Sequence, residues 1–429
     1  MRSFAGVAVL LLLPMAAFAQ GNPGPFGGLF GRTPERVGKE YRLFEVRTAT
    51  TGQYQQALND GSISLEDARS SSALGAASVS ATFAQRSSRL EARIRTNATQ
   101  LQYFQSPYNG GTAVDTSGSL TFRVATRLVL NGSVSHVYSP YFQYHPQAFS
   151  WTADGVLVPP LNPYVATVIE TNSYHAGGGV SIPYSKRSSL AASFHRSETR
   201  FLKHREFDQT MSAVRGNWSR QLNRDFRLKF GYGRDQARAR AGGEYVFETF
   251  DAGVDFTRTS IRHRLSLSMN TQPSMVTTPQ YGRQYRLNGA LMLTRGFQRT
   301  WQVGVNLHRN TDFVPGFADP LLSDTFGLRL SGLMSRSVEL VLQADAGRGQ
   351  LSFHSGAATF AMASSRAQFN VALARRVGVF FQHALFYYDL PRSASSVAPV
   401  TSLASQTVTI GLTTWIPVYT RERSPSDTR

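Results

Sequence analysis

The sequence contains no cysteine and few lysines. The first absence excludes disulfides, thiolate metal sites, cysteine nucleophiles and a lipid anchor on an N-terminal cysteine. The second means that arginine supplies nearly all of the positive charge behind a formal net charge of +18. These cations are spread between apolar residues and form no basic tail or clustered helix, which argues against nucleic acid as a partner.

Long apolar runs are also missing. After residue 19, no stretch approaches the roughly 18 apolar residues that a membrane-spanning helix requires. The mean hydropathy is −0.24 and 41% of the residues are hydrophobic. Composition alone therefore also allows a soluble secreted protein, and the pattern along the chain has to decide.

Residues 1–19 have the three parts of a signal peptide. A positive start contains Arg2, an apolar run extends from Val7 to Leu13, and small residues stand at Ala17 and Ala19. A buried helix of a cytosolic protein is the alternative, but it has no need of these parts in this order. We expect cleavage between Ala19 and Gln20, which exports the mature chain.

Residues 20–40 are rich in glycine and proline and predict a flexible periplasmic leader. From residue 41 onward, apolar and polar residues alternate with a period of two, the pattern of β-strands with one apolar face. Near residue 90, for example, Leu90, Ala92 and Ile94 alternate with charged residues. Similar apolar stripes recur near residues 228, 265, 289, 303, 340, 371 and 410.

The stripes come in pairs joined by short polar links, and longer irregular segments separate the pairs. The predicted short links are 86–88, 185–188, 221–225, 258–260, 294–300, 335–337 and 374–377. Short links alternating with long ones are typical of an up-and-down membrane barrel, whereas Greek-key sandwiches mix link lengths less regularly. We predict an all-β, transmembrane, antiparallel barrel of about 18 strands over residues 41–419, with 16 strands as the alternative and residues 420–429 as a polar tail.

Aromatic residues occur near both ends of the predicted strands. Tyr138, Tyr141, Tyr174, Tyr245, Tyr387 and Tyr388 lie at the ends near long links, and Trp218, Phe226, Phe256 and Trp301 lie at the ends near short links. Two aromatic girdles at the two membrane interfaces would give this distribution. The alternative is that aromatic residues simply favour strands.

With these features, residues 41–419 resemble Gram-negative outer-membrane β-barrel proteins of the porin-like kind. The resemblance is architectural and indicates no subfamily. It implies an outer-membrane location, contact with lipid and lipopolysaccharide, and insertion by the barrel-assembly machinery. Members often end on a strand that closes with an aromatic residue, and Thr407 to Tyr419 is similar. Pro417 and the polar tail after Tyr419 depart from that pattern.

The polar faces of the predicted strands contain many cations. The predicted pore-lining residues are Arg89, Glu91, Arg93, Arg95, Arg123, Arg215, Arg227, Lys229, Arg262, Arg264, Arg286, Arg329 and Arg366. Four further carboxylates share these faces: Asp251, Asp255, Glu339 and Asp345. One role of these cations and carboxylates is to form rows of ion pairs that stiffen the barrel wall. The remaining excess of positive charge predicts a lumen that favours anions.

Signs of catalysis or cofactor binding are weak. The histidines lack the spacing of zinc sites, and neither a nucleophile elbow nor a phosphate-binding loop occurs, so we expect no catalytic residues, metal or cofactor. The longest link, 139–172, holds several aromatic residues and either narrows the pore or forms an exposed binding loop. The sequence thus predicts a passive channel for small anionic solutes. The alternatives are a non-conducting structural or adhesion barrel and an enzyme acting on lipid.

Overall fold

The structure is a computed structural model of the whole chain. It describes residues 40–58, 71–104, 110–125, 127–140, 142–143, 166–167, 170–240, 243–259, 263–278, 282–297, 300–312, 320–351, 359–374, 376–389 and 402–423. Residues 20–39 of the predicted leader, and most of the link 139–172, lie outside these residues, whereas Glu40 belongs to the first strand. No helix in the described part of the chain is long and apolar enough to cross a membrane.

Eighteen strands form one closed antiparallel sheet, as predicted, and the alternative of 16 is wrong. Its strands are β1 (Glu40–Ala57), β2 (Ser71–Arg86), β3 (Leu90–Tyr103), β4 (Gly111–Ala125), β5 (Leu128–Ser139), β8 (Thr171–Ile182), β9 (Ser188–Phe201), β10 (Gln209–Gln221), β11 (Phe226–Ala239), β12 (Gly243–Thr259), β13 (His263–Thr278), β14 (Gly282–Phe297), β15 (Trp301–Asp312), β16 (Leu321–Leu333), β17 (Val338–Leu351), β18 (Thr359–Ala374), β19 (Val377–Asp389) and β20 (Ser402–Arg423). A short pair, β6 (Phe142–Gln143) with β7 (Ala166–Thr167), lies within the longest link, and a 3-10 turn, η1 (Arg205–Phe207), follows β9.

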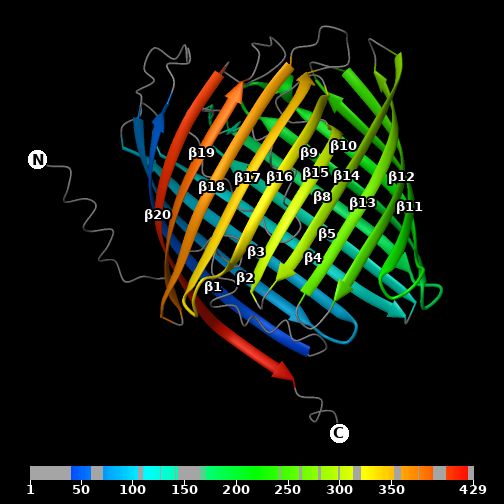
Figure 1. Cartoon of the computed structure of the whole chain (residues 1–429), viewed down its shortest axis with the longest axis horizontal. Coiled ribbons are helices and arrows are strands. Elements are labelled where there is room, and N and C mark those ends of the chain that lie inside the picture. The colour runs from blue at the N-terminus through cyan, green and yellow to red at the C-terminus, as the bar shows by residue number, and fades with distance from the viewer. Residues whose placement is uncertain are drawn as a thin grey trace, which may run out of the picture.

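Pairing of β1 with β20 closes the barrel, so every strand has a neighbour on both sides. Because Glu40 lies opposite Arg423, the chain enters and leaves the barrel at the same end (Figure 1). The register between β1 and β20 shifts where Glu45 opposes Pro417 and Phe44 opposes Tyr419. A bulge at this point lets β20 continue past a proline, which has no N–H group to donate to the ladder.

Links at the end where the chain enters are short throughout: 87–89, 126–127, 183–187, 222–225, 260–262, 298–300, 334–337 and 375–376. We call this the turn end and the opposite one the loop end. The prediction of strictly alternating short and long links is wrong in two places, because links 240–242 and 279–281 at the loop end are also short. Gly243 and Gly282 follow them with φ of 91° and 67°, a conformation that glycine adopts without strain.

The outer face of the barrel bears exposed apolar side chains around its whole circumference. Ile94, Leu120, Val134, Phe194, Val214, Phe230, Phe250, Met269, Leu307, Phe326, Leu385 and Ile410 each come from a different strand. Exposed arginines on the same face follow toward the strand ends: Arg196, Arg234, Arg309 and Arg348 at the loop end, and Arg220, Arg258 and Arg295 at the turn end. An apolar band between two polar rims is the outer surface that a membrane barrel requires.

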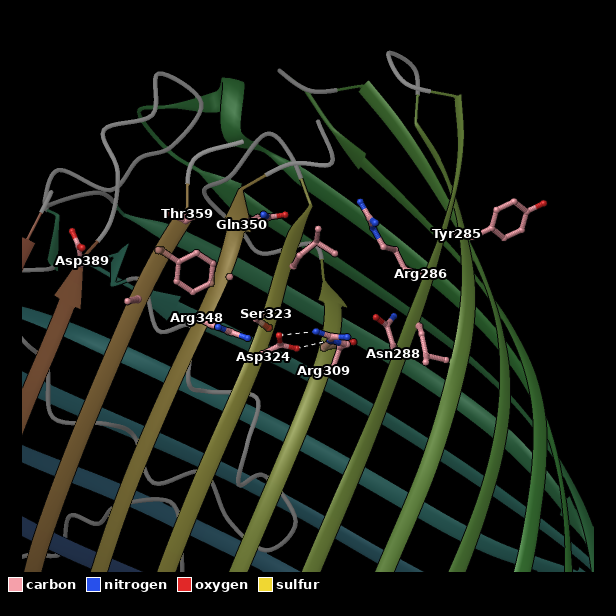
Figure 2. Close-up of a pocket in the computed structure, with 16 residues that line it drawn as sticks. Tyr285, Arg286, Asn288, Arg309, Ser323, Asp324, Arg348, Gln350, Thr359 and Asp389 are labelled. Carbon is pink, nitrogen blue, oxygen red and sulfur yellow. Dashed lines mark hydrogen bonds and ion pairs between the residues drawn. The ribbon is translucent and has the colours of Figure 1, made fainter. Parts of the chain in front are cut away.

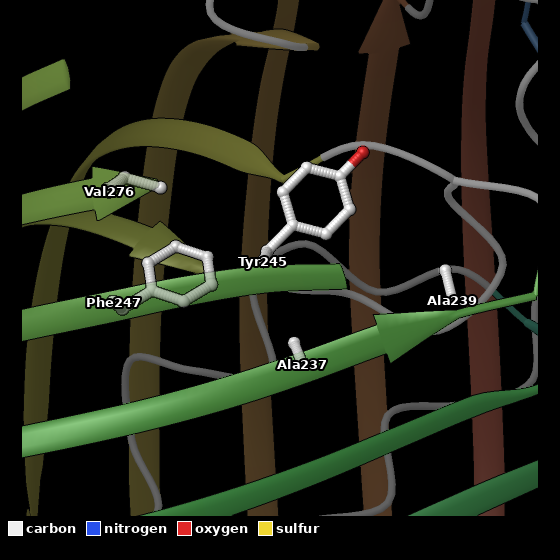
Figure 3. Close-up of a cluster of buried hydrophobic side chains, with 5 residues drawn as sticks. All are labelled: Ala237, Ala239, Tyr245, Phe247 and Val276. Carbon is white, nitrogen blue, oxygen red and sulfur yellow. The ribbon is translucent and has the colours of Figure 1, made fainter. Parts of the chain in front are cut away.

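The opposite face of the strands points into the lumen and is mainly polar, with buried apolar residues among the polar ones. Ala237, Ala239, Tyr245, Phe247 and Val276 project from β11, β12 and β13 toward the interior and are almost inaccessible (Figure 3). Tyr245 is only 3% exposed, so its assignment to an aromatic girdle is wrong. Its position in the sequence places it at a strand end, but its register places it on the lumen face.

Several of the other aromatic residues lie on the outer face as the girdles require. Tyr174 and Tyr387 are exposed toward the loop end, and Phe226 is exposed at the turn end. Phe226 packs against Phe256 on the neighbouring strand, with ring centroids 4.8 Å apart. Tyr141, and the side chain of Tyr388, lie outside the described part of the structure.

Candidate functional site

The candidate site is the charged face of the strands that surrounds the lumen. The registers place all the predicted residues in described strands on this face: Glu91, Arg93, Arg95, Arg123, Arg215, Arg227, Lys229, Arg264, Arg286, Arg329 and Arg366. Arg89 lies in the turn before β3, where its carbonyl accepts a hydrogen bond from the N–H of Arg123 at 2.7 Å. Arg262 lies outside the described residues.

Charged residues that the sequence prediction missed also face the lumen. They are Glu45 and Arg47 on β1, Arg86 on β2, Asp115 on β4 and Asp235 on β11. Each lies on the polar face of a segment in which apolar and polar residues alternate, and this alternation is the sequence feature that could have identified it. The additions include more carboxylates than cations. The positive excess on the described lumen wall is therefore smaller than the sequence suggests, but it keeps its sign.

One group of charges lies beside the seam that closes the barrel. An Nη atom of Arg47 is 2.6 Å from Glu45 Oε1, and the Trp415 indole N–H of β20 donates to Glu45 Oε2 at 2.9 Å. Glu45 is 3% exposed, and these two contacts provide partners for both of its buried carboxylate oxygens. In register, Glu45 lies across Thr82 from Arg95. One buried carboxylate thus lies among several guanidinium groups at the seam.

A second group occupies β10, β11 and β12. Arg215 lies 2.8 Å from Asp235, and Lys229 lies 2.5 Å from Asp255. Asp255 also accepts a hydrogen bond from the Ser268 hydroxyl at 2.8 Å. Arg227 stands directly opposite Asp255 in register, so two cations share that carboxylate. Asp251 on β12 also faces the lumen, so three carboxylates balance the three cations of this sector, and the net positive charge of the wall comes from other strands.

A third group lies in one row across β16, β17 and β18. Arg329 opposes Gln343, and Gln343 opposes Arg366. The Gln343 side-chain oxygen accepts a hydrogen bond from Arg366, and its amide donates to Asp345 at 2.7 Å. The glutamine therefore joins an arginine to a carboxylate and fixes the direction of the guanidinium.

The three groups face the lumen from different parts of its circumference, because their strands are far apart in the sheet order. Guanidinium groups stay charged at any biological pH and form paired hydrogen bonds with carboxylate and phosphate oxygens. A wall with a net excess of such groups can attract anions and offer them successive weak contacts. Within the described residues, no group of three or more histidine, aspartate or glutamate side chains could hold a metal ion.

The sequence matches no protein-family model, and no curated protein matches it in sequence. Its fold is similar to solved structures of outer-membrane proteins. These include Pseudomonas aeruginosa OccK10 (OpdN), with 11% identity, coverage of 88% of this chain and 99% of that one, and a TM-score of 0.46. They also include P. aeruginosa OpdQ (8% identity, 88% and 98% coverage, TM-score 0.48) and Acinetobacter baumannii OccAB3 (10% identity, 87% and 99% coverage, TM-score 0.47). Similarity this low carries no argument about solute or mechanism, and the closed 18-stranded barrel stands on the strand pairing of this chain.

Proposed function

We propose that the chain is a passive channel in the outer membrane of a Gram-negative cell, with a preference for small anionic solutes. The closed barrel with an apolar outer band supports the membrane location. One observation carries the selectivity: on the described lumen wall, arginines outnumber carboxylates even after the ion pairs are counted. A signal peptide cleaved between Ala19 and Gln20 would deliver the chain across the inner membrane.

The excess charge acts through the field inside a narrow, water-filled barrel. A barrel of 18 strands is wide enough to leave an aqueous lumen. Fixed positive charges on its low-dielectric wall raise the local concentration of anions and lower that of cations. The side chains of Arg93 and Arg264 make no hydrogen bond or ion pair with another described residue, so their charges are available to a passing solute.

Single-channel recording of the purified protein in a planar bilayer tests this proposal. We expect discrete conductance steps and a higher permeability to chloride than to potassium. Replacing Arg93, Arg264 and Arg286 by serine should lower that preference, and the change should shrink as salt rises because screening shortens the reach of each charge to about 10 Å at 0.1 M. A barrel that gives no steps would instead be structural or adhesive.

The matched control removes the same charge from the outer face. Arg196, Arg234 and Arg283 are exposed on the outer face near the loop end. Their replacement by serine should leave the ion selectivity nearly unchanged. Equal effects of the two triple variants would contradict a selective lumen wall.

A further inference from the structure

The wall of the barrel splits between β14 and β15. Their pairing runs from Phe297 opposite Trp301 to Gly289 opposite Arg309 and stops there. β14 continues to Gly282 paired only with β13, and β15 continues to Asp312 paired only with β16. Toward the loop end, no backbone hydrogen-bond ladder therefore joins the facing edges of β14 and β15.

The upper part of β16 turns inward beyond this split. Leu322 shares a register face with the exposed Phe326, yet it packs against the lumen-side cluster that contains Val276. One side-chain contact still bridges the split, because the Thr311 hydroxyl of β15 donates to Asn288 Oδ1 of β14 at 3.0 Å. The hairpin of β15 and β16 thus leans into the barrel while β14 stays in the wall.

Two hollows occupy the split, with volumes of about 700 and about 470 Å³. They share Leu287, Asn288, Arg309 and Asp324, so they meet where the pairing ends. Side chains of both faces of β14 line them: Asn288 faces the lumen, and Leu287 faces outward. Tyr285 and Arg286 likewise point to opposite sides of β14 at the larger hollow (Figure 2). The opening therefore reaches both faces of the wall.

A row of charges lies on the outer side of this opening. Arg309, Asp324 and Arg348 are in register on β15, β16 and β17 and lie side by side (Figure 2). Arg309 binds Asp324 through two bonds, Nε to Oδ1 at 2.6 Å and Nη to Oδ2 at 2.8 Å. The Arg348 side chain is exposed and, although it lies close enough to Asp324 for their charges to interact, it forms no hydrogen bond or ion pair with the side chain of another described residue. Because Asp324 is bound by Arg309, Arg348 is the cation of this row with room for an external anion, and Asp389 of β19 adds one carboxylate to the lining of the same hollow.

Below the charged row, the surface of the split is apolar. Leu307 on β15 and Phe326 on β16 are the next outward residues toward the turn end, and both are exposed. Met269 and Leu291 extend the apolar lining of the smaller hollow. A cationic upper part above an apolar lower part complements a molecule with an anionic head and an apolar chain. Each volume lies in the range of small-molecule sites.

We propose that the opening between β14 and β15 binds a single-chain amphipathic anion, a long-chain carboxylate, with its head group on Arg348 and its chain along Leu307 and Leu287. This site lies in the barrel wall and connects the lumen with the surrounding lipid, so it is distinct from the axial channel. Unpaired strand edges in a membrane are tolerated where they line a water-filled cavity, which a passage to the lumen provides.

Equilibrium binding of radiolabelled dodecanoate to the barrel in phosphatidylcholine nanodiscs tests the proposal. We expect saturable binding that weakens at least tenfold in Arg348→Gln and is unchanged in Arg234→Gln, which removes an exposed arginine of the outer face far from the split. Affinity should rise from octanoate to dodecanoate by up to about fourfold per methylene, as burial of the chain requires. Dodecanol should bind weakly because it lacks the charge.

A second measurement locates the site, and it exploits the absence of cysteine in the chain. In Leu287→Cys, dodecanoate should slow labelling of the only thiol by a maleimide at least several-fold. In Leu293→Cys, on the same face of β14 but outside both hollows, it should not. Equal protection of the two thiols would overturn the proposal, as would equal binding by Arg348→Gln and Arg234→Gln. Stronger competition by a two-chain phosphatidate than by dodecanoate would also overturn it. Binding is measured without conductance, so its failure is distinguishable from failure of the channel.

Discussion

The assignment of the two faces of the wall is tested most sharply at two adjacent residues of β14, Leu291 and Met292. Leu291 lies between the exposed Met269 and Leu307 on the outer face. Met292 lies between Ser268 and Asn306 on the lumen face. Because side chains alternate along a strand, moving an arginine by one position moves its charge from lipid to lumen.

Leu291→Arg places a guanidinium near the middle of the apolar band, where such a change costs about 2–4 kcal/mol in a membrane barrel. The folding equilibrium should fall about 30- to 700-fold. Met292→Arg should stay within about 0.5 kcal/mol of the unaltered protein, because its side chain remains in a polar, accessible lumen. Urea titration of both variants in vesicles of dilauroyl phosphatidylcholine measures the difference, with the folded fraction read from unboiled gel samples. Equal destabilisation by the two changes would refute the assignment of faces.

Three other outcomes are expected. Mass spectrometry of the protein from cells should show a chain beginning at Gln20, and an intact Met1 would contradict export by a cleaved signal peptide. Unboiled protein should migrate differently from boiled protein on a detergent gel, because a closed barrel has no free strand edge from which to unzip over most of its wall; identical mobility would count against closure. Glu45→Gln should lower stability by about 1–3 kcal/mol, because Arg47 loses a buried charged partner, and should raise anion preference in bilayer recordings. A lower anion preference would contradict the lumen position of Glu45.

The turn ends of the strands could be predicted from the sequence almost to the residue. The short links predicted at 86–88, 221–225 and 335–337 are observed at 87–89, 222–225 and 334–337. The loop ends could not, since β2 begins at Ser71 and β4 at Gly111, whereas the alternation in the sequence places the two strand starts near residues 76 and 118. The apolar alternation is imposed by lipid, whereas pairing continues beyond it through Ser, Thr, Ala and Gly that show no alternation. Extension of the strands past the apolar band also accounts for the short links at 240–242 and 279–281.

The face of each lumen charge was predictable, because a period of two assigns it from neighbouring residues alone. Its partner was not, because partners depend on the register between strands. Trp415 and Glu45 are 370 positions apart and meet only because β20 closes on β1. No feature of the sequence indicated the split between β14 and β15, because the residues around Gly289 alternate like those of any paired strand. It arises from the inward turn of a neighbouring hairpin, which is a property of the assembled barrel.

We propose that the lumen of this barrel conducts ions and favours anions. The most direct measurement is the reversal potential of the purified protein in a planar bilayer that separates two concentrations of potassium chloride. A positively charged lumen wall predicts a potential displaced from zero toward the equilibrium potential of chloride, and more so at low salt, where charges are screened least. A reversal potential displaced toward that of potassium, or a bilayer that stays silent with correctly folded protein, would contradict the account.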